Sequence, residues 1–150
     1  MKIVNFAEMN SELNRFVAEI RDIHIQQDRL RFRKNLERIG EVMSYEISKD
    51  FRYSEKLVTT PLGTARVNTA DDKIVIGTIL RAGIPYHQGF LNYFDRAENA
   101  FVSAYRKYKD KLNFEIFIEY IASPRIDGKI LILTDPMLAT GGSMELSYRA

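Results

Sequence analysis

The sequence contains no cysteine, which excludes disulfide bonds and metal centres held by cysteine. Only two histidines are present, His24 and His87, and they form neither an HxxxH nor an HExxH pattern. Neither is therefore a candidate metal ligand, and we expect no metal site built from protein side chains. The lack of cysteine suits a protein of the reducing cytoplasm, which is the location we expect.

Long apolar runs and an excess of charge of one sign are also lacking. Residues 1–9 carry a charge every few positions, so we expect neither a signal peptide nor a transmembrane helix, and no membrane partner. The net charge is +2, which gives no reason to expect nucleic acid as a partner. A length of 150 residues, 45% of them apolar and 28% charged, predicts one globular domain over residues 1–150.

Three helices are predicted in the first two thirds of the chain. Residues 11–26 carry apolar side chains at helical spacing, and the segment 32–47 carries an apolar stripe on a longer helix. The stripe consists of Phe32, Leu36, Ile39, Met43 and Ile47. The charges on its other faces are typical of a solvated surface or of a subunit contact. Pro85 fits the first turn of a third helix.

Three apolar runs predict buried strands of a parallel sheet, at residues 73–80, 100–105 and 130–133. Residues 114–121 alternate only in part, which predicts a half-exposed or edge strand. Two β-rich runs around a Pro-Leu-Gly turn within residues 56–67 predict a hairpin. Strands separated by helices favour an α/β fold with an open, mainly parallel sheet and flanking helices, here with N-terminal helices and a β-hairpin arm.

A loop rich in glycine and hydroxyl groups follows the run 130–133. Asp135 stands where that strand should end, and residues 139–143 read Ala-Thr-Gly-Gly-Ser. Such a loop can turn backbone N–H groups toward one phosphate, and the helix signal that begins at Met144 adds the positive end of its dipole. No lysine accompanies the glycines, so this is not a Walker A loop. The pattern predicts a phosphate site, although an aspartate before proline is also typical of a turn or helix cap.

A second loop, Arg81-Ala82-Gly83, follows the run 73–80 directly. An arginine at the end of a strand, beside a glycine that lets the backbone come close, suits a pyrophosphate site, and a surface ion pair is the alternative. Ligands of open α/β sheets bind beyond the carboxyl ends of the strands. We therefore expect the loops 81–83 and 135–143 to converge on one edge of the sheet.

Residues 130–143 resemble the phosphoribosyl-pyrophosphate (PRPP) motif of the type I phosphoribosyltransferases, in the form found in uracil phosphoribosyltransferases. The resemblance extends over about residues 30–143 and includes the following segments: Phe32-Arg33 with Met43-Ser44-Tyr45-Glu46, Thr60-Pro61-Leu62, Leu80-Arg81-Ala82-Gly83 and Tyr105-Arg106. Two departures stand out. Thr134 occupies the first of two positions that are acidic in most of the superfamily, and Lys107-Tyr108-Lys109 stands where an acidic residue usually follows the Tyr-Arg pair.

The resemblance implies transfer of the phosphoribosyl group from PRPP to uracil, giving UMP and pyrophosphate. It places Arg81 and Arg106, the latter on a loop after the third strand, at the pyrophosphate, Asp135 at the ribose hydroxyls, and residues 140–143 at the 5′-phosphate. The PRPP-binding residues that it implies are Arg81, Ala82, Gly83, Arg106, Asp135, Pro136, Met137, Leu138, Ala139, Thr140, Gly141, Gly142 and Ser143. Mg²⁺ is expected to arrive on the oxygens of PRPP.

Two alternatives to an active transferase remain. One is a non-catalytic regulator that binds PRPP or a nucleotide, some of which also bind RNA; Thr134 and the near-balanced charge argue against it. The other is a truncated, inactive family member, because the family continues past the helix at residue 144 with a Gly-Leu-Gly-Asp-Ala-Gly-Asp loop that recognises uracil. On this view the domain is incomplete at its C-terminus. The resemblance also implies a homodimer or larger homo-oligomer and, in some members, GTP as an effector.

Overall fold

The computed structural model describes residues 2–108 and 114–150, without the side chains of residues 105–108 and 114–116. The elements in chain order are η1 (Phe6–Glu8), α1 (Leu13–Arg21), η2 (Ile25–Gln27), α2 (Arg29–Ser48), β1 (Tyr53–Thr60), β2 (Gly63–Ala70), β3 (Ile74–Leu80), α3 (Ile84–Tyr93), β4 (Glu98–Tyr108), β5 (Phe114–Ala122), β6 (Ile130–Thr134) and α4 (Gly142–Arg149). The predicted helices and strands are present, although α1 is shorter than the 11–26 segment. It ends at Arg21 because the Asp22 carboxylate accepts the N–H groups of the next turn, from His24 and Ile25.

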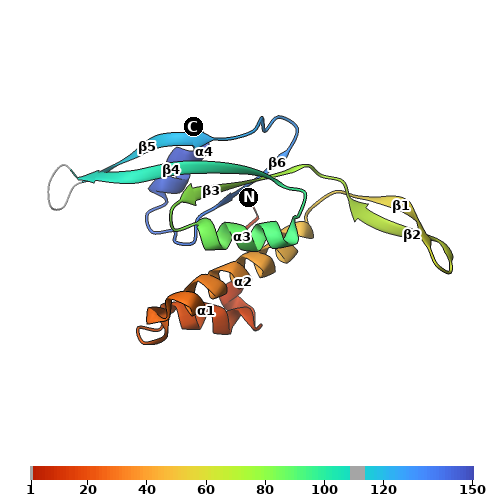
Figure 1. Ribbon diagram of the computed structural model, residues 1–150, viewed down its shortest axis with the longest axis horizontal. Helices are drawn as coiled ribbons and strands as arrows, with labels where there is room; N and C mark the ends of the chain where they lie inside the picture. The colour runs from red at the N-terminus through yellow and green to blue at the C-terminus, as the bar shows by residue number, and fades with distance from the viewer. Residues whose placement is uncertain (1, 109–113) are drawn as a thin grey trace.

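The main sheet has four strands in the order β5-β4-β3-β6. Strand β3 pairs in parallel with both β4 and β6, whereas β5 runs antiparallel to β4. The predicted open, mainly parallel α/β sheet is therefore confirmed, and β5 lies at an edge as expected. Strands β1 and β2 form a separate antiparallel hairpin, which we call the arm, and it projects away from the body of the molecule (Figure 1).

Two expectations about strands were wrong. The apolar run 130–133 predicted a strand covered on both faces, but in the part of the chain that the structure describes β6 is an edge strand, and Leu131 is 36% exposed. An apolar run indicates burial without specifying which strand takes the edge. The third strand was expected to end at Tyr105, yet β4 continues to Tyr108 because its antiparallel pairing with β5 extends that far.

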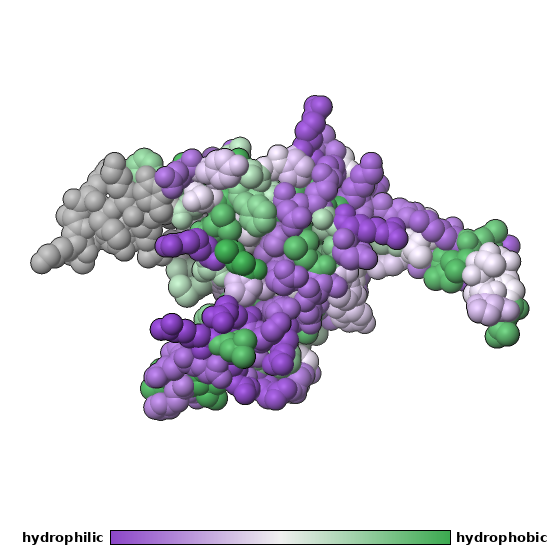
Figure 2. Space-filling view, in the orientation of Figure 1, coloured by the Kyte–Doolittle hydropathy of each residue, from purple (hydrophilic) through white to green (hydrophobic). Residues whose placement is uncertain are grey.

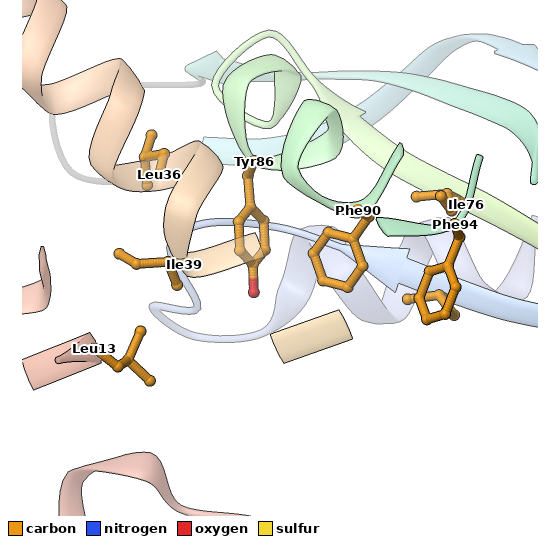
Figure 3. Packing of buried hydrophobic residues seen from close by; sticks show 8 residues of the cluster. Leu13, Leu36, Ile39, Ile76, Tyr86, Phe90 and Phe94 are labelled. Carbon is orange, nitrogen blue, oxygen red and sulfur yellow. The ribbon is translucent and has the colours of Figure 1, made fainter. Parts of the chain in front are cut away.

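The core lies between the sheet and the helices, and in Figure 1 α3 is nearest the sheet, followed by α2 and then α1. Tyr86 and Phe90 of α3 pack edge to face, with ring centroids 5.0 Å apart. Figure 3 shows them beside Leu36 and Ile39 of the predicted α2 stripe. This packing fixes α3 against the sheet, and with it the loop that joins β3 to α3. No helix in the described ranges is both long and apolar enough to cross a membrane.

His87 of α3 is a buried histidine, 5% exposed, between α3 and β4. Its Nε2 lies 2.7 Å from Oδ1 of Asn99, so a neutral ring can donate its proton to that oxygen. The ring also contacts Phe101, with centroids 5.1 Å apart. Burial lowers the pKa of His87, because a charged imidazolium would lose its hydration, and the Asn99 hydrogen bond opposes this shift.

This burial predicts a stability that depends on pH. Because the pKa of His87 is lower in the folded chain than its unfolded value of about 6.5, the unfolded state takes up the proton first as the pH falls. The free energy of unfolding should therefore decrease below about pH 6.5, with a contribution of at most about 1.4 kcal/mol per pH unit. Urea unfolding between pH 7.5 and 5.5 should show a shallower decrease for His87→Gln. The exposed His24 serves as the control, and an equal change of slope in His24→Gln would contradict the assignment.

Candidate functional site

The loops after β3 and β6 lie at the same edge of the sheet. Thr78 and Thr134 are paired Cα positions on these neighbouring parallel strands. Arg81 follows Thr78 by three residues, and Asp135 follows Thr134 directly. The expected convergence of loops 81–83 and 135–143 is therefore confirmed.

Asp135 leaves the end of β6 as a half-buried residue. Its Oδ1 accepts the backbone N–H of Met137 at 3.3 Å, so the carboxylate also shapes the turn that begins the loop. The charge of Asp135 acts on α3 as well: burial and then this carboxylate raise the pKa of Tyr86 to about 12. The Tyr86 phenol is therefore neutral and donates its proton to the sulfur of Met43.

The loop closes into a small hollow at the start of α4. Asp135 and residues 137–144 line this hollow. Gly141 has φ +79°, a left-handed conformation that favours glycine, and it is the N-cap of α4. Helix α4 begins at Gly142, two residues before the expected start at Met144. The N–H groups of a first helical turn have no acceptor inside the helix, so this hollow presents backbone donors and the positive end of the dipole.

The shorter loop, residues 81–83, is exposed at its first residue and buried at its last. Arg81 is exposed, and no carboxylate in the described part of the chain forms an ion pair with it. Gly83 is buried, and its N–H donates to the carbonyl oxygen of Ile79 at 3.2 Å. The peptide bond between Leu80 and Arg81 is cis. The guanidinium is thus available to an anion at the carboxyl edge of the sheet.

Two buried hydroxyls beneath these loops had no predicted role. Thr78 and Thr134 are 0% and 3% exposed, and their hydroxyl oxygens lie 2.8 Å apart. A hydroxyl in the otherwise apolar run 73–80, and a threonine in an acidic position of the motif, were the signals that could have drawn attention to them.

Arg106 is not placed as expected. It was predicted to follow the third strand, but its backbone lies within β4, paired with Ile116. The antiparallel ladder with β5 holds this part of the chain as a strand. The side chain of Arg106 lies outside the described residues, so its predicted role at the pyrophosphate stays a prediction.

The other candidate regions lie elsewhere or hold no metal-ligating cluster. Among residues 2–108 and 114–150, no three histidine, aspartate or glutamate side chains come together as a cation site would require. A larger hollow of about 500 Å³ lies at the opposite edge of the sheet, beside the first residues of β3 and β4. None of the predicted site residues lines it.

The fold and the loop geometry define a class of protein: an α/β protein whose glycine-rich loop and helix N-terminus stand beyond the carboxyl ends of parallel strands. The family model for uracil phosphoribosyltransferase matches residues 9–149. The chain belongs to the uracil phosphoribosyltransferase family, and the predicted family and transferase class are confirmed.

Three relatives illustrate the extent of the similarity. The uracil phosphoribosyltransferase of Porphyromonas gingivalis is 64% identical over 150 residues, all of this chain and 69% of that protein. The enzyme of the same name from Methanothermobacter thermautotrophicus is 43% identical over 115 residues, 75% of this chain and 53% of that protein. The solved structure of the AQ2163 protein from Aquifex aeolicus has a TM-score of 0.79 at 34% identity, and covers 91% of this chain and 64% of that one.

The left-handed conformation of Gly141 predicts how phosphate binding responds to substitution. Gly141→Ala should weaken binding of inorganic phosphate by about tenfold, because a Cβ disfavours this conformation by about 1–2 kcal/mol and the loop must change shape. Calorimetric titration measures the dissociation constant. Gly128→Ala is the matched control, since Gly128 has φ +69° in a turn with open space around it. Gly128→Ala should lower stability and leave phosphate binding unchanged. If Gly141→Ala binds phosphate as tightly as Gly128→Ala does, the anion binds elsewhere.

Proposed function

We propose that this chain binds PRPP across the two converging loops and transfers its phosphoribosyl group to uracil, forming UMP and pyrophosphate. The observation that carries the proposal is the placement of an exposed arginine and a loop with exposed backbone N–H groups at the ends of adjacent strands. Membership of the uracil phosphoribosyltransferase family supports the substrates. PRPP carries phosphate groups at both ends, and it therefore needs two anion sites a fixed distance apart.

Each proposed role follows from the chemistry of the groups. The backbone N–H groups of residues 140–143 receive the 5′-phosphate at the N-terminus of α4. The Asp135 carboxylate accepts hydrogen bonds from the ribose hydroxyls. Arg81 binds the pyrophosphate, with Arg106 assigned to the same group by the resemblance alone. Ala82 and Gly83, and Pro136 to Ala139, supply the backbone that surrounds the ligand.

The reaction breaks the bond between C1 and the pyrophosphate oxygen and joins a uracil nitrogen to C1. Its transition state has oxocarbenium character, as in glycoside hydrolysis, so negative charge gathers on the departing pyrophosphate. A guanidinium that faces this group stabilises the charge as it develops. Asp135 and the 140–143 loop hold the ribose in place, which lowers the entropic part of the barrier.

Mg²⁺ is the proposed cofactor, carried by PRPP. Asp135 is the carboxylate of the site, and Mg²⁺ is commonly held by one or two carboxylates together with substrate phosphates and water. When bound, the ion neutralises charge on the leaving pyrophosphate. A cytoplasmic location and regulation by GTP are proposed on the resemblance alone.

We also propose that the chain forms a homodimer, for which the arm is the main support. Leu57 is 70% exposed and Leu62, at the tip, is 100% exposed. Figure 2 shows hydrophobic side chains gathered toward the far end of the arm. An isolated two-stranded hairpin is marginal in water, so a second copy that covers these side chains would stabilise it.

The proposed role of Arg81 predicts a loss of rate. Arg81→Ala should lower kcat for uracil-dependent release of pyrophosphate by about one to three orders of magnitude, with little change in uracil binding. Arg125→Ala is the control, because Arg125 lies on the exposed segment before β6 and pairs with Asp127. Binding of PRPP without any uracil-dependent release would favour the binding-only alternative, and equal losses in both variants would remove Arg81 from the site.

The arm predicts a change in assembly. Leu62→Asp places a charge at a position that is 100% exposed in the single chain, so stability of the monomer should be unaffected. If a second copy covers the tip, the dimer should dissociate at least about tenfold more readily, as measured by sedimentation equilibrium. Asn68→Asp adds the same charge to a polar position of β2 and should have a smaller effect. A sedimentation mass that Leu62→Asp leaves unchanged would contradict the proposal.

A further inference from the structure

A pair of threonine hydroxyls joins the two strands from which both loops arise. Thr134 lies within hydrogen-bond distance of two acceptors: its hydroxyl can donate to the carbonyl oxygen of Gly77 at 3.0 Å, and it lies 2.8 Å from the hydroxyl of Thr78. The Thr78 hydroxyl is in turn 3.4 Å from the carbonyl oxygen of Thr134. Both side chains are almost completely buried. The two hydroxyls therefore satisfy each other and the backbone of the facing strand.

The same pair touches both halves of the candidate site. A Cβ on Gly83 would overlap the Thr78 hydroxyl and would lie 2.7 Å from the carbonyl oxygen of Ile79. The backbone of loop 81–83 thus rests directly on Thr78. Thr134 is the last residue of β6, and Asp135 follows it. A displacement of either hydroxyl therefore moves one loop relative to the other.

We propose that Thr78 and Thr134 form a positioning pair, which sets the separation between loop 81–83 and the Asp135 loop so that one PRPP molecule engages both. The assignment rests on the proposed function and deepens it. Neither threonine reaches the ligand, so neither is a catalytic residue. Each acts through a neighbour, Thr78 through Gly83 and Thr134 through Asp135.

The residue types suit this role. A carboxylate at position 134 would be a buried charge, and among the described residues no lysine or arginine forms a hydrogen bond with Thr134. The hydroxyls of Thr78 and Thr134 instead form a hydrogen bond that buries no charge, and each hydroxyl has a partner. Loss of one of them would leave the other buried without its partner. The threonine in an acidic position of the motif is therefore explained by a bond within the protein, whereas Asp135 remains free to face the ligand.

The ligand itself offers a way to separate positioning from binding. Ribose 5-phosphate occupies only the Asp135 and 140–143 side, and pyrophosphate occupies only the Arg81 side. PRPP occupies both, so its affinity alone depends on the separation of the loops. The product of the dissociation constants of ribose 5-phosphate and pyrophosphate, divided by the dissociation constant of PRPP, measures this coupling.

The decisive substitution is Thr134→Val in the whole chain, titrated with the three ligands in the presence of Mg²⁺. We expect PRPP binding to weaken by about tenfold while ribose 5-phosphate and pyrophosphate each change by less than about twofold. Thr134→Ser retains the hydroxyl and should restore PRPP binding. The double variant Thr78→Val with Thr134→Val leaves no orphaned hydroxyl, so it should fold well and still lack the coupling.

A matched pair elsewhere provides the control. Thr59 and Thr64 face each other across β1 and β2 of the arm, and their replacement by valine should leave all three affinities unchanged. Equal weakening of all three ligands by Thr134→Val would show a merely structural role and overturn the proposal, as would unchanged binding of PRPP. Failure of the unsubstituted chain to bind PRPP would instead contradict the proposed function itself.

Discussion

Parallel pairing of β3 with β4 and β6 is the constraint on which the candidate site depends. Because the three strands point the same way, their carboxyl ends meet at one edge, and the loops that leave β3 and β6 become neighbours. The pairing of Thr78 with Thr134 brings residues 56 positions apart in the chain into contact. If β6 ran antiparallel to β3, Asp135 would lie at the opposite end of the sheet from Arg81.

Much of this arrangement was predictable because the relevant signals are local. The α2 stripe, the arm and the strand runs each follow from spacing within a few residues, and the two loops follow from their place after strands. Ligands of open α/β sheets bind beyond the carboxyl ends of the strands. This rule predicts that the two loops lie close together, without any knowledge of side-chain contacts. The order of the motif from Ile130 to Ser143 was enough to indicate the family.

Sequence patterns could not show which strands pair with one another or how far each pairing extends. The run Ile130–Leu133 looks equally buried whether its strand is central or at an edge, and only the pairing shows that β6 takes the edge. The reach of β4 past Tyr105 depends on its partner β5 and not on its own residues. Thr78 reads as one hydroxyl among apolar neighbours, because its partner lies on another strand.

The two connections at this edge differ in length, and this difference has a consequence for how the site receives a ligand. Three residues join β3 to α3, whereas seven residues, 135–141, join β6 to α4. The short connection is confined by the strand, the buried Gly83 and the packed helix, so it acts as a rigid reference. The longer one carries Met137 and Leu138, 73% and 69% exposed, so fewer contacts hold its side chains in place. A ligand that contacts both connections should therefore find the backbone of residues 81–83 already in place, whereas residues 135–141 adjust their shape to it.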